Sequence, residues 1–207
     1  MPDTEAPRRH PIGRAQGVEF DVVAWDGAHA DVALSVACMF RREAAGAVIR
    51  GGLLHLDQAL GGALTALRSS GDFRADEMET LLIQTPPAGV RAKQLLIIGL
   101  GDPETLSSGL LERAIRVAVR EAVRAGAASV AFAPSLLDAG VVSGVTGDGA
   151  VAMLRGALRA LAAESRLAAL GLSPPPRLTR WSFDAGPTHL DSVGGEFGEA
   201  FARLTTA

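Results

Sequence analysis

Apolar residues along this chain form short unbroken runs that alternate with longer stretches of helical spacing. The unbroken runs are bounded by glycine, proline and acidic residues, which is typical of strands that are covered on both faces. They lie at residues 18–25, 32–40, 79–85, 94–100, 129–134 and 180–184. These segments are the strands that the pattern predicts.

Four other segments carry apolar residues at every third or fourth position, which is the spacing of an amphipathic helix. They begin near residues 56, 107, 148 and 190, and the first is striped by Leu56, Leu60, Ala63, Leu64 and Leu67. Ser107 or Ser108 offers an N-cap for the second helix, and Asp148 offers one for the third. Gly126 and Gly171 follow the last residues of these two helices, where glycine commonly ends a helix.

Strands that alternate with helices predict an α/β fold, with a mixed or largely parallel sheet in a three-layer α/β/α arrangement. The chain has 207 residues, which is enough for one sizeable core, and we expect residues 18–207 to form a single domain. Residues 1–17 are polar and proline-bearing, and we expect them to form a flexible tail.

The most informative segment is residues 56–102, which read LDQALGGALTALRSSGDF, then ETLLIQTP, then RAKQLLIIGLGD. A helix with a double glycine, a Gly-Asp-Phe turn, an apolar strand and a strand that runs into Gly-Leu-Gly follow in this order. The order and spacing resemble the N-terminal domain of the leucyl aminopeptidase family, which are two-metal, typically hexameric cytosolic exopeptidases. The resemblance covers about residues 18–204 and implies a macrodomain-like sheet flanked by helices.

The same resemblance implies that the peptidase chemistry of the family is absent from this chain. A two-metal site needs several carboxylates around ions about 3.5–4 Å apart, and in the resembled family these ligands lie in a C-terminal catalytic domain. The signature of that domain, of the type Asn-Thr-Asp-Ala-Glu-Gly-Arg, does not occur here, and the only lysine, Lys93, matches a basic position of the N-terminal pattern. We therefore expect no catalytic residue, no metal and no cofactor.

Other patterns that carry chemistry are also missing from the sequence. The histidines His10, His29, His55 and His189 have no partner at a spacing typical of zinc sites. No Gly-x-Ser-x-Gly segment occurs. Cys38 is the only cysteine and lies in an apolar run, so we expect a core residue with a raised pKa and no disulfide within the chain.

Glycine-rich turns are the places where the sequence favours a ligand. The Gly-Leu-Gly-Asp turn at 99–102 follows a strand, and the GVTGDG segment at 144–149 precedes a helix. Backbone N–H groups at such turns can hold an anion, although glycine also serves simply to permit a tight turn.

The similarity to macrodomains indicates which of these glycine-rich turns could bind a ligand. Macrodomains bind ADP-ribose at glycine-rich loops, and the glycines before the helix at 56 and after the strand at 94–100 lie near the corresponding positions. The Asn-Ala-Ala-Asn type of loop found in macrodomains is not present. The candidate ligand-binding residues are Gly51, Gly52, Gly99, Gly101 and Asp102.

Charge and hydropathy limit the partners. The net charge is −3, and the arginines on one face of the helix at 107–126 are Arg113, Arg116, Arg120 and Arg124. Some bacterial members of the resembled family bind DNA, but Glu112 and Glu121 lie within pairing distance of Arg116 and Arg124, so we expect a salt-bridged solvent face and no nucleic acid. No secretory signal or apolar segment of about 20 residues occurs, and we expect a cytoplasmic protein that does not contact membranes.

Three functions are compatible with these observations. The preferred one is a stand-alone, non-catalytic binding, assembly or regulatory module. The second is the non-catalytic half of a split metallo-aminopeptidase in peptide turnover, with the catalytic domain encoded separately. The third is a macrodomain-like binder of a nucleotide such as ADP-ribose. Because the resembled family forms hexamers, we also expect a homo-oligomer.

Overall fold

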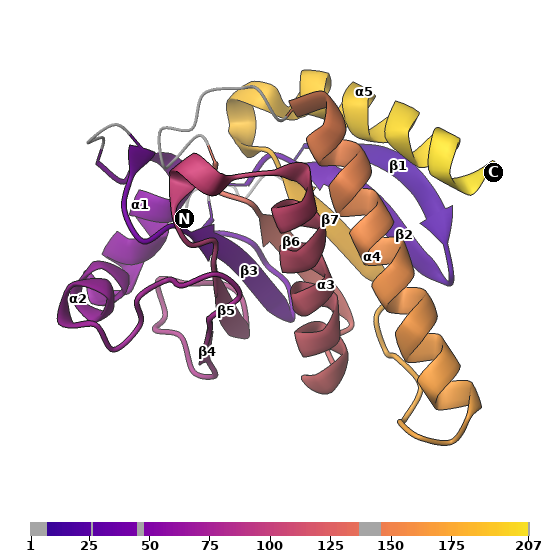
Figure 1. Cartoon of the computed structure of the whole chain (residues 1–207), viewed down its shortest axis with the longest axis horizontal. Coiled ribbons are helices and arrows are strands. Elements are labelled where there is room, and N and C mark those ends of the chain that lie inside the picture. Colours follow the sequence, from indigo (N-terminus) through magenta and orange to yellow (C-terminus); the bar gives the residue numbers. More distant parts are fainter. Residues whose placement is uncertain (1–7, 26, 45–47, 137–145, 207) are drawn as a thin grey trace, which may run out of the picture.

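The computed structural model describes residues 8–25, 27–44, 48–136 and 146–206 (Figure 1). The strands are β1 (Arg9–Ala15), β2 (Val18–Val23), β3 (Leu34–Met39), β4 (Thr80–Ile83), β5 (Gln94–Gly99), β6 (Ser129–Ala133) and β7 (Arg180–Asp184). The helices are α1 (Gly51–Ala59), α2 (Ala63–Ser70), α3 (Ser108–Arg124), α4 (Thr146–Ala169) and α5 (Gly186–Thr205). No helix within these ranges is both long and apolar enough to cross a membrane.

The strands form a seven-stranded sheet in the order β1-β2-β7-β6-β3-β5-β4. The pairs from β2 through β7, β6 and β3 to β5 are parallel, and the edge strands β1 and β4 pair antiparallel with β2 and β5. The predicted α/β fold with a mixed sheet is therefore confirmed.

Helices cover both faces of the sheet, which gives the three layers visible in Figure 1. On one face α3, α4 and α5 pack against the larger core, which includes the aromatic side chains of Phe132, Trp181 and Phe183. On the other face α1 and α2 contribute Leu53, Leu56 and Leu64 to a smaller core. Alternate residues of the central strands enter the two cores, because successive side chains of a strand point to opposite faces.

The flexible tail predicted for residues 1–17 is wrong for residues 9–15, which form β1. This strand pairs antiparallel with β2 through a tight turn at residues 16–17, where both φ angles are positive, at 52° and 81°. Gly13 lets β1 approach α5, since a Cβ atom there would lie 2.4 Å from the ring of Phe201. Sequence pattern missed this strand because an edge strand can be polar and can contain proline.

The single helix predicted from Leu56 is divided into α1 and α2. Gly61 and Gly62 separate the two helices with positive φ angles of 67° and 81°, a backbone conformation that glycine adopts without strain. The apolar stripe continues across the break, which is why periodicity alone did not reveal it.

A buried carboxylate compensates for the missing cap of α2. The N-cap residue is Gly62, which has no side chain, and Asp57 of α1 accepts hydrogen bonds from the N–H groups of Leu64 at 2.9 Å and Thr65 at 3.3 Å. The hydroxyl of Thr65 donates to the second carboxylate oxygen. Because Asp57 is only 6% exposed, these bonds replace water that cannot reach it.

A close helix contact joins α3 and α4. A Cβ atom on Gly156 would lie 2.5 Å from Cγ2 of Ile115, so only glycine permits this approach. Glu112 accepts hydrogen bonds across the contact from Arg155 at 2.9 Å and Arg159 at 2.8 Å. Partial burial acts to raise the pKa of Glu112, but the bonds from the two arginines outweigh it and lower the pKa.

We predict that Asp57→Ala lowers the free energy of unfolding by about 1–2 kcal/mol, because it removes the cap of α2. Urea denaturation of the purified chain measures this loss. Asp191→Ala is the matched control, since its pair with Arg8 is exposed and should contribute about 0–1 kcal/mol at most. Equal losses in the two variants would contradict the capping role.

Candidate functional site

Open α/β sheets bind ligands outside the carboxyl ends of their strands, at the point where the connections run in opposite directions. In this sheet that point lies between the neighbouring strands β3 and β6. The chain continues from β3 to β4 and β5 on one side of this point, and from β6 to β7 on the other side. The segments after these strands include residues 45–47 and 137–145, which lie outside the described ranges. The predicted glycine turn at 144–149 falls partly there, and its last four residues belong to α4.

The predicted turn at 99–102 lies at the carboxyl end of β5, and its N–H groups are already used. The N–H groups of Gly99, Leu100 and Gly101 each donate to a backbone carbonyl at 2.8–2.9 Å. The acceptors, in the same order, are Glu79, Met39 and Ala75. These three N–H groups are therefore not free to hold an anion, and ligand binding at this turn stays a prediction without support from its amides.

Close packing explains the glycines of this turn. A Cβ atom on Gly99 would lie 2.1 Å from the carbonyl oxygen of Asp76, closer than any real contact. Gly101 has a φ of +72°, which favours glycine, and faces Glu77. Both residues thus allow the segment before β4 to lie directly against the end of β5.

Gly51 and Gly52 lie at the start of α1 and have different neighbours from Gly99 and Gly101. Gly51 has a φ of +55°, and the carbonyl oxygen of Gly52 would lie 2.6 Å from a Cβ atom on Gly27. Gly52 therefore packs against the β2–β3 connection. The structure places the predicted glycines in two separate packing contacts.

Asp102, the remaining predicted residue, caps a short 3₁₀ helix at Pro103–Thr105. Its carboxylate accepts a hydrogen bond from the N–H of Glu104 at 3.0 Å, and it forms an ion pair with Arg42 at 3.0 Å. The bond from Glu104 and the charge of Arg42 together lower the pKa of Asp102. This carboxylate therefore has a local structural role.

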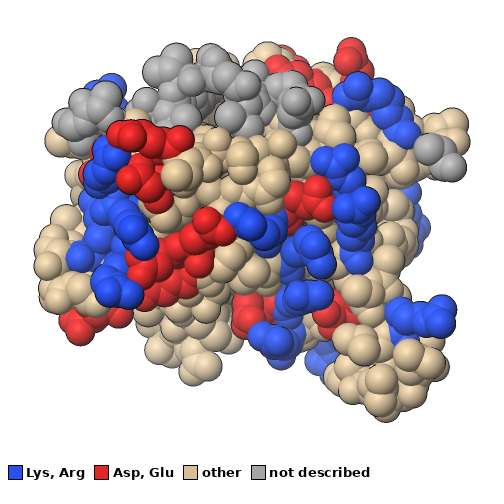
Figure 2. Space-filling view, in the orientation of Figure 1, with Lys and Arg blue, Asp and Glu red and all other residues tan. Residues whose placement is uncertain are grey.

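A group of arginines that the sequence did not single out surrounds a hollow beside this turn. The hollow, of about 330 Å³, is lined by Arg41, Arg68, Arg74 and Asp76. Arg41 follows β3, Arg68 lies on α2, and the other two residues lie in the segment between α2 and β4. In Figure 2 basic and acidic side chains are intermixed on the left side of the molecule.

The hollow is held by ion pairs within the described residues. Asp76 pairs with Arg41 through one oxygen at 2.5 Å and with Arg74 through the other at 2.7 Å. Arg68 is mostly buried, donates to the carbonyl of Phe40 at 3.0 Å and pairs with Glu43 at 2.8 Å. The three arginines come from segments far apart in the sequence, which periodicity could not bring together.

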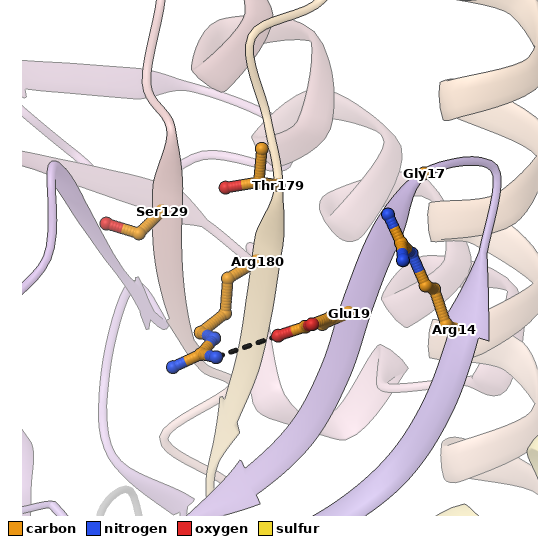
Figure 3. Close-up of a pocket in the computed structure, with 6 residues that line it drawn as sticks. All are labelled: Arg14, Gly17, Glu19, Ser129, Thr179 and Arg180. Atoms are coloured by element: carbon orange, nitrogen blue, oxygen red, sulfur yellow. Dashed lines mark hydrogen bonds and ion pairs between the residues drawn. The ribbon is translucent and has the colours of Figure 1, made fainter.

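A second hollow, of about 380 Å³, lies at the opposite edge of the sheet, at the amino ends of β2, β6 and β7 (Figure 3). Its lining residues are Arg14, Gly17, Glu19, Ser129, Thr179 and Arg180. Arg180 donates to Glu19 at 2.7 Å, and this bond lowers the pKa of Glu19. Because ligands of parallel sheets bind at the carboxyl ends, this larger hollow is the weaker candidate.

Both hydroxyl groups of this second hollow hold the sheet together. Ser129 accepts a hydrogen bond from the N–H of Ala33 at 3.0 Å, and Thr179 donates to the carbonyl of Ala128 at 3.0 Å. Figure 3 shows them on neighbouring segments, beside the paired Arg180 and Glu19. Their bonds connect strand ends and do not converge on a reacting group.

The described residues hold no group of three or more His, Cys, Asp or Glu side chains that could bind a metal ion. Cys38 is buried in β3, and burial raises the pKa of its thiol to about 12. At neutral pH it is a thiol, which is a poor nucleophile.

The predicted pairing on α3 is confirmed in part. Glu121 pairs with Arg124 at 2.5 Å, whereas Glu112 pairs across to α4 and not with Arg116. The error arises because the sequence did not show that α4 lies alongside α3.

Comparison with known proteins identifies a family. The family model described as the cytosol aminopeptidase family, N-terminal domain, matches residues 42–166. A probable cytosol aminopeptidase of Acidobacterium capsulatum is 41% identical over 70 residues, which are 34% of this chain and 14% of that protein. One of Alkaliphilus metalliredigens is 33% identical over 79 residues, which are 38% of this chain and 16% of that protein. The matches thus span a small part of the relatives' length.

Solved structures share the fold. A mutant macrodomain of Oceanobacillus iheyensis has a TM-score of 0.63 at 13% identity, and the match covers 100% of this chain and 98% of that one. A mutant leucine aminopeptidase of tomato has a TM-score of 0.53 at 18% identity, covering 96% of this chain and 36% of that one. At such identities the likeness shows a common macrodomain-like fold and nothing about ligands.

We predict that Gly99→Ala lowers the free energy of unfolding by about 1–3 kcal/mol or more, because the added methyl group overlaps the carbonyl of Asp76. Gly195→Ala is the control: it lies within α5 with nothing inside 4 Å of the added Cβ, and it should stabilise by about 0.5–1 kcal/mol. Thermal and urea unfolding compare the two. A neutral Gly99→Ala would contradict the packing role of this glycine.

Proposed function

This chain belongs to the cytosol aminopeptidase family, whose N-terminal domain it carries, and from this premise we propose that it acts as a non-catalytic binding and assembly module. In this proposal the chain contributes a surface for a protein partner, and the metal-dependent peptidase chemistry resides in a different domain. A cytoplasmic location is part of the proposal, and the family description supports it.

The observation that carries the proposal is the exposed apolar end of α4. The C-terminal turns of α4 and the connection to β7 extend beyond α3 and the sheet (Figure 1). Leu167, Leu170 and Leu172 are 38%, 59% and 71% exposed there. We call residues 163–176 the α4 tip. Three large apolar side chains close together on a projecting segment are typical of a surface that a protein partner covers.

Burial of these three leucines would favour association. Full burial of a leucine side chain stabilises by about 1.5–3 kcal/mol, so three leucines supply several kcal/mol toward a complex. Few charges interrupt the α4 tip, with Glu164 and Arg166 as its charged residues. We propose that the partner is a second copy of this chain, since the α4 tips of two copies can bury the same leucines against each other.

We predict that Leu170→Glu together with Leu172→Glu converts the purified chain from a dimer or higher oligomer into a monomer. Two carboxylates at a shared apolar contact repel each other and would have to lose their hydration. Light scattering at micromolar concentration measures the mass. Val48→Glu is the matched control, because Val48 is 69% exposed elsewhere on the surface and its replacement should leave the mass unchanged.

A monomeric wild-type chain would contradict self-assembly and would direct attention to the two alternatives. Co-purification of a zinc-binding polypeptide would favour the non-catalytic half of a split metallo-aminopeptidase. A rise in melting temperature with ADP-ribose would favour the nucleotide binder, since a ligand that binds only the folded state stabilises it.

A further inference from the structure

The arginine hollow at the carboxyl end of β3 has the properties of an anion site. Its three guanidinium groups come from separate segments: Arg41 after β3, Arg68 on α2, and Arg74 after α2. Arginine presents five N–H donors in a planar fork that matches the oxygens of phosphate and carboxylate groups. Three such groups around a hollow of about 330 Å³ therefore define a specific chemical preference.

Most donors of these arginines are unused within the described residues. Arg41 contacts Asp76 through Nε, and Arg74 contacts the same carboxylate through one terminal nitrogen. The remaining N–H groups of both side chains are open to water, since Arg41 is 56% exposed and Arg74 is 69% exposed. An incoming anion can therefore bind without breaking the existing ion pairs.

Arg68 is the most firmly held of the three arginines. Its side chain is 14% exposed and is held by the carbonyl of Phe40 and by Glu43. Glu43 balances the charge of Arg68, and the single carboxylate of Asp76 is shared by Arg41 and Arg74, so an excess of one positive charge lies with these two exposed arginines.

We propose that this hollow binds a phosphate-type oxyanion, either free phosphate or the phosphate group of an ester. A carboxylate ligand would carry a single negative charge, as Asp76 already does, so we expect it to bind more weakly than phosphate. A phosphate carries up to two charges and several acceptor oxygens, which three converging guanidinium groups can share. The site does not use the amides of Gly99 and Gly101, and it is independent of the proposed assembly through the α4 tip.

Asp76 weakens the attraction of the hollow for an anion without being displaced by it. Its two oxygens each hold one of the exposed arginines, so the carboxylate occupies part of the positive field. Replacing it with asparagine keeps the size of the side chain and removes the charge. Asp76→Asn should therefore strengthen phosphate binding, whereas loss of an arginine should weaken it.

The test is isothermal titration calorimetry of the purified full chain, at constant ionic strength in chloride buffer, with inorganic phosphate in one arm and glycerol phosphate in another. We expect saturable binding of one anion per chain, with acetate much weaker. Arg41→Gln and Arg74→Gln should each weaken binding about tenfold, since one charge-assisted hydrogen bond is lost. Asp76→Asn should strengthen it severalfold, and Arg203→Gln, on exposed α5, should have no effect.

The two arms distinguish the sources. Binding in both arms identifies the phosphate group itself as the ligand, and binding of glycerol phosphate alone identifies an ester. If neither inorganic phosphate nor glycerol phosphate shows saturable binding, the proposal is overturned. Equal weakening by Arg203→Gln would also overturn it, because it would show a general charge effect. Circular dichroism checks that each variant is folded.

Discussion

The central strands β3 and β5 are buried on both faces, and the other layers of the structure depend on this burial. All six residues of β3 are buried, as are all those of β5 except Gln94. Such strands are stable only when helices remove both faces from water, so α3, α4 and α5 are needed on one side and α1 and α2 on the other. The same burial lines the middle of these two strands mainly with apolar side chains, and the charged groups of the two hollows lie at the ends of strands.

At the carboxyl end of β5 the packing is so close that the backbone N–H groups of the turn are used in hydrogen bonds within the protein. Gly99 and Gly101 lie against the segment before β4, and their N–H groups bind its carbonyls or those of neighbouring strands. With these amides already bonded, the proposed phosphate site at this edge uses the side chains of the arginines beside the turn. The turn at residues 99–102, which resembles a ligand-binding loop in sequence, packs closely against the segment before β4 in this structure.

Much of the fold was predictable because it depends on local patterns. Unbroken apolar runs identified β3 and β5, and the stripe with its capping serine identified α3, whose N-cap Ser107 accepts from the N–H of Leu110. The strand β1 was missed because an edge strand does not need apolar residues. The hollow of Arg41, Arg68 and Arg74 could not be predicted, because its residues come from segments that are far apart in the sequence. The family resemblance, carried by the order of elements from residue 56, is confirmed by the match to residues 42–166.

The central claim is that this chain supplies the binding domain of its family and not the peptidase. Its most direct test is hydrolysis of leucine p-nitroanilide by the purified chain with added Mn²⁺ or Zn²⁺, measured against buffer that contains the same metal. The account predicts no hydrolysis above that background. Metal-dependent turnover that follows the chain through purification and is lost on chelation would contradict it.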